Sequence, residues 1–165
     1  MKILLSAIIL LLSFKVQSQI LGCKDLISLS SCQNNLSFKK SVLNMGFIYV
    51  DKDTFESRVY YNYYSKMEFI CSSNSDVKFA DMTSVSFKRD GNTLISYSTG
   101  VLSHYEIIFN GLSKYGFYFT KADGNDQYYT SPSYPKMVIM ISTDDKTTDA
   151  GDHWKMYTYT IAIVK

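Results

Sequence analysis

The chain has 165 residues, enough for one domain or for two very small units that share a core. Its 46% hydrophobic content and its two prolines exclude a disordered or linker-rich chain. With 17 basic and 15 acidic residues and no basic cluster, the composition argues against nucleic-acid binding, which depends on neutralising phosphates.

Residues 1–18 predict a secretory signal peptide. Lys2 precedes an apolar run, Ile3–Phe14, that is too short to span a bilayer. Val16 and Ser18 then place small residues where signal peptidase reads them, which predicts cleavage after Ser18. Cleavage would remove two of the 17 basic residues and leave 15, equal to the 15 acidic ones. We therefore expect a nearly neutral protein that is secreted or periplasmic.

Residues 19–33 form a separate N-terminal segment that contains Cys23 and Cys32. Export permits a disulfide between these two cysteines, which would close a short loop. Alternatively, the sequence Ile20–Cys23 resembles a lipoprotein processing site, which would place a lipid on Cys23 and make the protein a lipid-anchored envelope component. We expect membrane contact only in that case. The third cysteine, Cys71, lies in a strand pattern and is interpreted as a buried thiol.

The rest of the chain reads as two repeats, residues 34–99 and 100–165, displaced by about 70 residues. Met45-Gly46-Phe47 matches Tyr115-Gly116-Phe117, Lys66–Ile70 matches Lys136–Met140, Asp53 matches Asp123, and Ser72 matches Ser142. Because several matches share one register, we interpret the chain as an internal duplication.

Each repeat is predicted to begin with a helix. Phe38, Val42 and Met45 recur at helical spacing, and Gly46 is a natural stop. The second helix is predicted to open with a capping box, to carry one apolar stripe and to end at a glycine. The residues are Ser103 and Glu106 for the box, Tyr105, Ile108 and Leu112 for the stripe, and Gly116 for the end.

Antiparallel strands are predicted after each helix, because the segments are rich in β-branched and aromatic residues. In repeat one they are Phe47–Val50, Arg58–Tyr64, Met67–Cys71 and Thr83–Lys88, with Leu94–Thr99 added after an Asp90-Gly91 turn. In repeat two they are Phe117–Thr120, Gln127–Ser131, Met137–Ile141 and Trp154–Val164.

Side chains alternate between the two faces of a strand, so Met137, Ile139 and Ile141 should face the helices. The opposite face is mixed, with Thr158 and Thr160 on the last strand, and can stay wet. The predicted fold class is therefore α+β: two tandem helix-plus-antiparallel-sheet repeats, with the helices packed on one sheet face.

This layout of paired glycine-terminated helices and following strands resembles the tandem α/β repeats of β-lactamase-inhibitory-protein-like domains. The resemblance is architectural and covers most of the chain after the leader. It implies two similar units whose sheets join into one surface that grips a partner protein.

The leading functional hypothesis is an exported, non-enzymatic protein-binding module, inhibitor- or immunity-like, with no cofactor and no catalytic residues. Tyr and Trp suit such recognition, because they offer a large rigid contact area with a polar tip. The predicted partner-binding residues are Tyr60, Tyr64, Tyr128, Tyr129, Tyr134 and Trp154.

The alternative enzyme hypothesis is a metal-dependent hydrolase that uses the acidic run Asp144–His153. The spacing is not that of a calcium loop, and a solvated hairpin loop is the default interpretation. The other histidine, His104, is expected on the surface of the second helix, near Glu106, with no partner for a catalytic triad.

Overall fold

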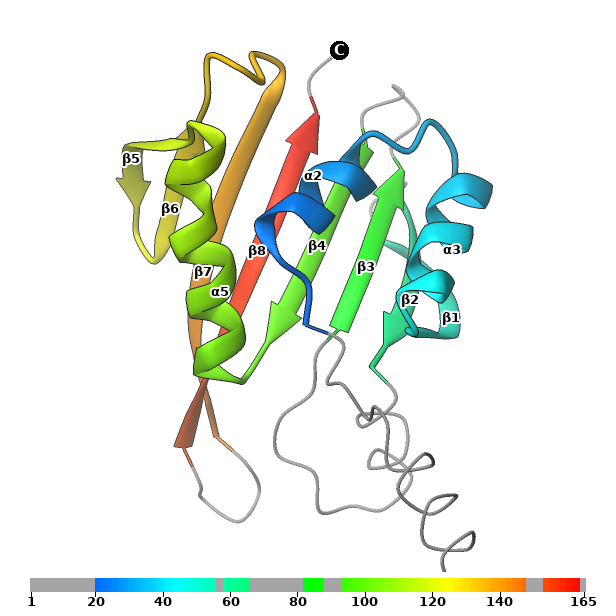
Figure 1. Ribbon diagram of the computed structural model, residues 1–165. Coiled ribbons are helices and arrows are strands. Elements are labelled where there is room, and N and C mark those ends of the chain that lie inside the picture. The colour runs from blue at the N-terminus through cyan, green and yellow to red at the C-terminus, as the bar shows by residue number, and fades with distance from the viewer. Residues whose placement is uncertain (1–19, 56–57, 66–81, 88–92, 148–152, 164–165) are drawn as a thin grey trace, which may run out of the picture.

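The computed structural model describes residues 20–55, 58–65, 82–87, 93–147 and 153–163 and has an α+β fold (Figure 1). The helices are α2 (Cys23–Ser30), α3 (Asn35–Asn44) and α5 (Leu102–Leu112), which continues into a 3₁₀ turn at Ser113–Tyr115. The strands are β1 (Ile48–Phe55), β2 (Arg58–Tyr64), β3 (Met82–Phe87), β4 (Thr93–Thr99), β5 (Tyr118–Asp123), β6 (Asp126–Thr130), β7 (Met137–Thr147) and β8 (His153–Ile163).

The strands form one antiparallel sheet of eight, in the order β1-β2-β3-β4-β8-β7-β6-β5. In each half of the chain, a helix is followed by four strands that each pair with the next. The two meanders join through their last strands, where Tyr97 of β4 lies opposite Tyr159 of β8. The first strand of each half, β1 or β5, is therefore a free edge of the sheet.

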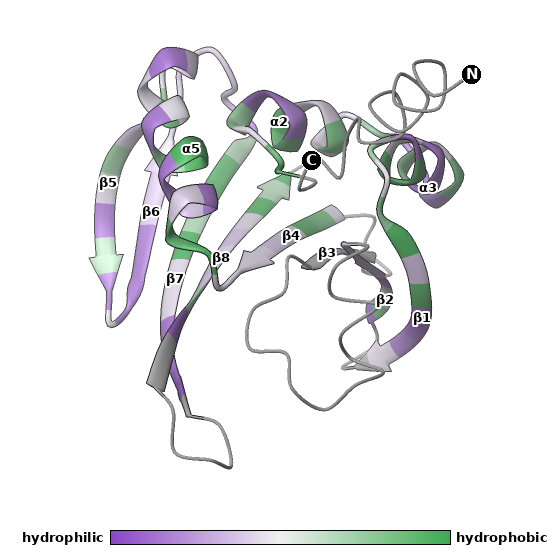
Figure 2. Ribbon diagram, turned by 60° about the horizontal axis from the view of Figure 1, so that its bottom comes forward, coloured by the Kyte–Doolittle hydropathy of each residue, from purple (hydrophilic) through white to green (hydrophobic). Residues whose placement is uncertain are grey.

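The helices α5, α2 and α3 lie side by side over one face of the sheet (Figures 1 and 2). Ring contacts fix α3 and α5 in place: Phe38 meets Tyr63 of β2 at 5.8 Å between ring centroids, and Tyr105 stacks on Tyr157 of β8 at 4.3 Å. Helix α2 contacts α3, α5, β4 and β8, so it covers the junction of the two halves.

The core lies between these helices and the sheet, as the alternation of side chains predicts. Ile139 and Ile141 of β7 and Tyr159 and Ile161 of β8 are at most 2% exposed. Burial of such side chains contributes about 1.5–3 kcal/mol each, which is why this face fixes the register of the sheet.

Both long helices end at the predicted glycines. Gly46 has φ +89° and Gly116 has φ +72°, a left-handed conformation that a residue with a Cβ adopts at a cost. The following phenylalanine N–H then bonds back into the helix, from Phe47 to the Val42 carbonyl at 3.2 Å and from Phe117 to the Leu112 carbonyl at 3.0 Å.

Both edge strands carry a β-bulge one residue after an exposed aromatic side chain. The register shifts between Tyr49 and Asp51 on β1, and between Phe119 and Lys121 on β5. Bulges twist an edge strand and limit its pairing with other chains.

The predicted displacement of 70 residues describes only the helix and the first strand of each half. The second strands are related by a shorter step, since Tyr63 on β2 and Tyr129 on β6 both oppose the aromatic residue before the bulge. The predicted strand Met67–Cys71, the matched Ser72 and the turn at Asp90-Gly91 lie outside the described residues. The third strand of the first half is β3, which begins at Met82.

One local prediction was wrong, and one segment has a local structure that was not expected. The capping box at Ser103 and Glu106 does not form, because α5 begins at Leu102 with Val101 as its N-cap. The residues 24–31, expected as a disulfide-closed loop, are mostly helical: α2 begins at Cys23, with the Asp25 carboxylate accepting the Gly22 N–H at 2.9 Å.

Candidate binding face

The face of the sheet opposite α2, α3 and α5 is named the open face. In the described part of the chain no helix lies over it, and most of its side chains are partly exposed. Its described members are Tyr60, Asn62 and Tyr64 on β2; Leu94, Ser96 and Ser98 on β4; Thr158, Thr160 and Ala162 on β8; Val138, Met140 and Ser142 on β7; and Asp126, Tyr128 and Thr130 on β6.

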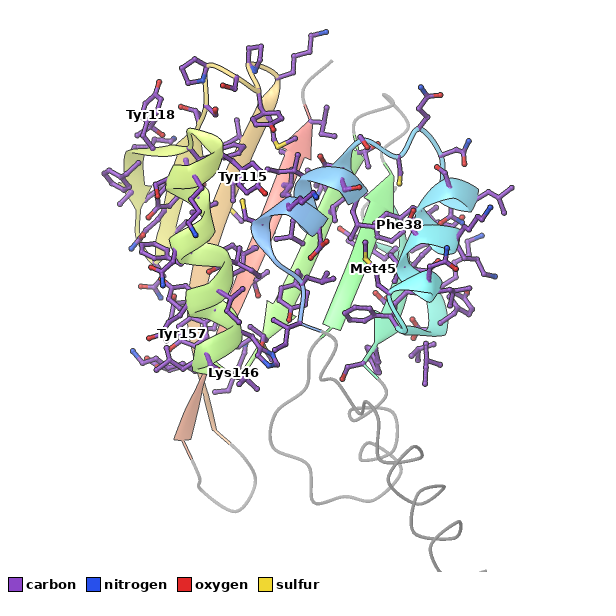
Figure 3. All side chains as sticks on the ribbon, viewed as in Figure 1. Phe38, Met45, Tyr115, Tyr118, Lys146 and Tyr157 are labelled. Atoms are coloured by element: carbon purple, nitrogen blue, oxygen red, sulfur yellow. The ribbon has the colours of Figure 1, made fainter. Side chains whose placement is uncertain are left out.

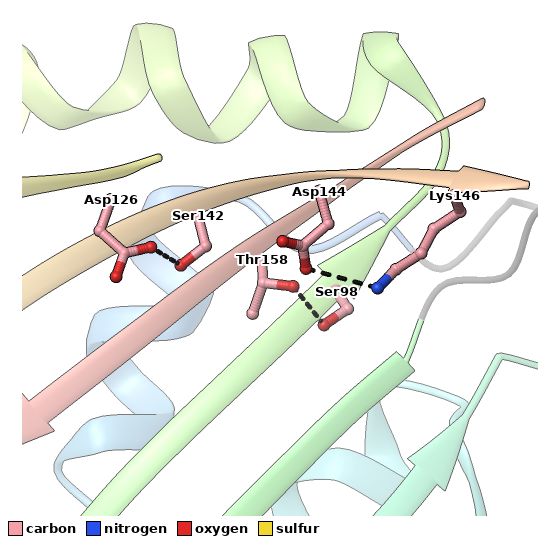
Figure 4. Close-up of polar contacts among 6 residues, drawn as sticks. All are labelled: Ser98, Asp126, Ser142, Asp144, Lys146 and Thr158. Carbon is pink, nitrogen blue, oxygen red and sulfur yellow. Dashed lines mark hydrogen bonds and ion pairs between the residues drawn. The ribbon is translucent and has the colours of Figure 1, made fainter. Parts of the chain in front are cut away.

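Hydroxyl groups form the centre of the open face. Ser98 and Thr158 share a hydrogen bond of 2.9 Å across the junction of β4 and β8, and Ser96 and Thr160 share one of 3.3 Å. On β7, Ser142 donates to the Asp126 carboxylate at 2.6 Å, and these polar contacts follow one another across the strands in Figure 4. The centre is a polar surface held by cross-strand pairs.

Tyrosines flank this hydroxyl centre on both sides. Tyr60 and Tyr64 stand on β2 and Tyr128 on β6, and all three are partly exposed. The Lys121 ammonium lies 4.6 Å from the centre of the Tyr128 ring, a cation–π contact that orients both groups. The sequence named these three tyrosines, and the structure brings them to one face.

Two of the other predicted binding residues, Tyr129 and Tyr134, lie elsewhere. Tyr129 is 8% exposed on the helix side of the sheet, and its hydroxyl donates to the Gln127 side chain at 2.8 Å. Tyr134 stacks on buried Phe117 with 5.5 Å between ring centroids, so it closes the core after β6. Trp154 pairs with Lys146 through the backbone of β8, and its side chain lies outside the described residues.

The described residues of the acidic run Asp144–His153 belong to strands: 144–147 to β7 and His153 to β8. Asp144 and Asp145 are consecutive residues near the end of β7, so their carboxylates project from opposite faces of the sheet and cannot bind one ion together. Asp144 pairs with Lys146 at 3.5 Å and Asp145 pairs with Lys155 at 3.9 Å. Within the described ranges, no cluster of His, Cys, Asp and Glu could hold a metal ion.

A shallow hollow of about 310 Å³ lies beside the β5–β6 turn. Its walls are polar and include Gln127, Thr143 and the exposed pair Asp145 and Lys155. Because those two charges neutralise each other in water, the hollow has no field that would concentrate an ion.

Cys23, the first residue of α2, and Cys32, two residues after its end, are both free in the structure, whereas the sequence predicts a disulfide between them. Cys23 begins the helix and Cys32 follows its end; at about 1.5 Å per residue, the seven steps from Cys23 to Ser30 alone span roughly 10 Å. Bridging them would require α2 to unwind, since bonded cysteines need Cα atoms within about 7 Å.

Cys23 is also buried, and this bears on its chemistry. Its side chain is 4% exposed, and burial raises the pKa of its thiol to about 11, so it stays protonated at neutral pH. A Cβ on Gly111 of α5 would lie 2.8 Å from the Cys23 Cβ, which shows how closely the two helices approach.

His104 was expected on the surface, and this was wrong: it is 7% exposed in the first turn of α5. His104 lies four residues before Ile108 and eight before Leu112, the other buried residues of α5, so it falls on the helix face that packs on the core.

Comparisons of the chain with protein-family models, with curated proteins and with solved structures find no match. Among the described helices, none is long and apolar enough to cross a bilayer.

Proposed function

We propose that this chain is an exported, non-enzymatic protein-binding module that holds its partner on the open face. The observation that supports the proposal is the placement of α2, α3 and α5 on one face of an eight-stranded sheet, with Tyr60, Tyr64 and Tyr128 on the other. A half-exposed tyrosine beside fixed hydroxyl groups suits a protein interface, because such rings bury much area with little loss of conformational entropy.

The same proposal includes a tandem duplication of one helix-and-meander unit. It is supported by the equal element order, the left-handed Gly46 and Gly116, and the bulges at Val50 and Thr120. From the resemblance of the sequence layout to β-lactamase-inhibitory-protein-like domains, we infer an inhibitor- or immunity-like role.

The signal peptide at residues 1–18 lies outside the described residues, and export remains part of the proposal. Mass determination of the N-terminus of the protein isolated from its source tests it. We expect a chain that begins at Gln19 and carries no lipid.

Affinity capture from the native exported fraction tests partner binding. The wild-type protein should retain one partner that Tyr64→Ala and Tyr128→Ala retain at least roughly tenfold less well, which is the effect of losing a tyrosine anchor. The matched control is Tyr49→Ala, since Tyr49 is 38% exposed on the helix side of β1.

Thermal unfolding of each variant accompanies the capture. Tyr64→Ala and Tyr128→Ala should melt close to the wild-type temperature, because the side chains are partly solvated. Equal capture by all three variants, or loss of capture only together with unfolding, would exclude the open face as the binding surface.

A further inference from the structure

The two free edges of the sheet differ in how much they expose. All six residues of β5 are exposed, and Tyr118 and Phe119 expose 55% and 54% of their surface. Figure 3 shows Tyr118 directed away from the body of the molecule at this edge. Large aromatic groups on a free edge strand are unusual for a chain that stays alone, because such edges pair readily.

The hydrogen-bonding direction of β5 follows from its hairpin. Gly124 and Asn125 form a two-residue turn closed by the pair Asp123 and Asp126. That closing pair exchanges hydrogen bonds in such hairpins, and bonded and non-bonded pairs alternate along an antiparallel ladder. Ala122 therefore directs its N–H and C=O away from β6, toward the free edge.

We propose that β5 is the site where a second copy of this chain docks, edge to edge and antiparallel, about a two-fold axis at Ala122. Ala122 then exchanges both backbone hydrogen bonds with Ala122 of the second copy. Lys121 lies opposite Asp123 of the second copy, and the symmetry repeats this ion pair. Both side chains belong to the open-face side, since they are two residues apart on one strand.

The other edge shows why the partner is a second copy and why β5 is the strand it uses. The same counting from the pair Phe55 and Arg58 makes Thr54 and Lys52 the outward residues of β1, and Lys52 is the one that lies 70 positions before Ala122. A two-fold axis at Lys52 would place Asp51 opposite Asp53 of the second copy twice, and like charges directly opposite each other are destabilising. Lys121 stands where β1 has Asp51, so the register that repels itself on β1 is self-complementary on β5.

The exposed aromatic side chains fit this arrangement. With the axis at Ala122, the Gly124-Asn125 turn of the second copy lies beside the bulge and Phe119, so the turn of one chain covers the ring of the other. The bulge at Thr120 restricts the pairing between the two copies to residues 121–123 of β5. Because this pairing is short, its stability depends on the ion pairs between Lys121 and Asp123. This inference is independent of what the open face binds.

Sedimentation velocity of the purified full chain over a range of micromolar concentrations tests the docking. The wild-type protein should approach twice the mass of the chain. Lys121→Asp, which copies the charge pattern of β1, should raise the dimer dissociation constant by roughly tenfold or more, and adding Asp123→Lys should restore dimers.

Proline supplies a second test with a matched control. Ala122→Pro removes the outward N–H without breaking a bond to β6, so the chain should fold and remain monomeric. Lys52→Pro makes the same change on β1 and should leave the dimer intact.

A wild-type chain that stays monomeric throughout would overturn the proposal. So would a dimer that survives Ala122→Pro and Lys121→Asp. If an unrelated extended peptide binds β5 while no dimer forms, the edge takes another occupant and the proposal is also wrong.

Discussion

The two halves of the molecule share a backbone plan and differ in the surface that they build on it. In the first half, the ammonium of Lys39 on α3 covers the ring of Tyr49 at 5.1 Å from its centroid. The corresponding residues of the second half are Phe109 and Phe119, which both meet the edge of the Tyr129 ring at about 6 Å. One half thus shields its outer aromatic with a cation, and the other leaves a partly exposed three-ring cluster.

The halves also differ where they meet α2. Gly111 on α5 lies so close to Cys23 that a Cβ would clash, whereas its counterpart on α3 is Ser41, whose hydroxyl is 3.9 Å from the Cys32 sulfur. Helix α2 therefore sits asymmetrically, tight against the second half. The two halves have the same order of strands and the same glycine-terminated helices, and single side-chain differences determine which neighbours each half contacts.

The largest expected effect tests whether the halves unfold together. Phe38→Ala and Ile108→Ala empty corresponding core positions that are at most 1% exposed, and each should cost about 2–5 kcal/mol. Because β4 pairs with β8 and α2 spans both halves, each variant should shift one common transition in urea, followed by circular dichroism. Two separate transitions would show that the halves are independent units.

The next effect concerns the packing of α2, which is closer against α5 than against α3. Gly111→Ser should destabilise the protein by about 1–3 kcal/mol, since the new Cβ pushes α2 and α5 apart. The reverse exchange in the other half, Ser41→Gly, should cost under about 1 kcal/mol, which is a helix-propensity effect alone. Equal costs, measured by chemical unfolding, would mean that α2 contacts both helices equally.

Alkaline pH should weaken the protein through its buried tyrosines. Burial raises the pKa of Tyr63 to about 12, above the value near 10 expected in the unfolded chain. Stability is therefore complete below about pH 10 and falls as the pH rises toward 12, because only the unfolded chain releases this proton. Unfolding free energies measured across that range should decline, and Tyr63→Phe should flatten the decline; an unchanged slope would exclude Tyr63 as a source.

The smallest expected effect contrasts two tyrosines in corresponding strands. The Tyr63 hydroxyl is buried and finds no hydrogen-bond partner in the described part of the chain, whereas Tyr129 donates to Gln127. At neutral pH, Tyr63→Phe should be neutral or stabilising by up to about 1 kcal/mol, and Tyr129→Phe should cost about 1 kcal/mol. Melting temperatures that fall equally would show that the two hydroxyl groups are equivalent.

Much of the fold could be predicted because local signals agreed with it. Strand β2 was predicted with its observed bounds, Arg58–Tyr64, and both glycine-terminated helices are present. Helix α2 was missed, since its eight residues are few and two cysteines suggested a disulfide loop. Its buried residues Cys23, Leu26 and Leu29 do recur at helical spacing, and that was the available signal.

The binding face could be predicted only in part. Alternation along β2 and β6 places Tyr60, Tyr64 and Tyr128 together once the strands are known. The hydroxyl pairs Ser98 and Thr158 could not be foreseen, because they exist only where β4 joins β8, and no local pattern specifies which distant strands pair. For the same reason, the sequence could not show that Tyr129 faces the helices and not the open face, since that depends on the register of β6.

The meander order of the sheet has a kinetic consequence. Every strand pairing except that of β4 with β8 joins neighbours along the chain, so most loops that must close during folding are short. Low contact order speeds folding, and we expect this sheet to form faster than a Greek-key sandwich of equal size. Pairing of β4 with β8 is then expected to be the slow step of folding, because it must bring together two meanders that have already formed.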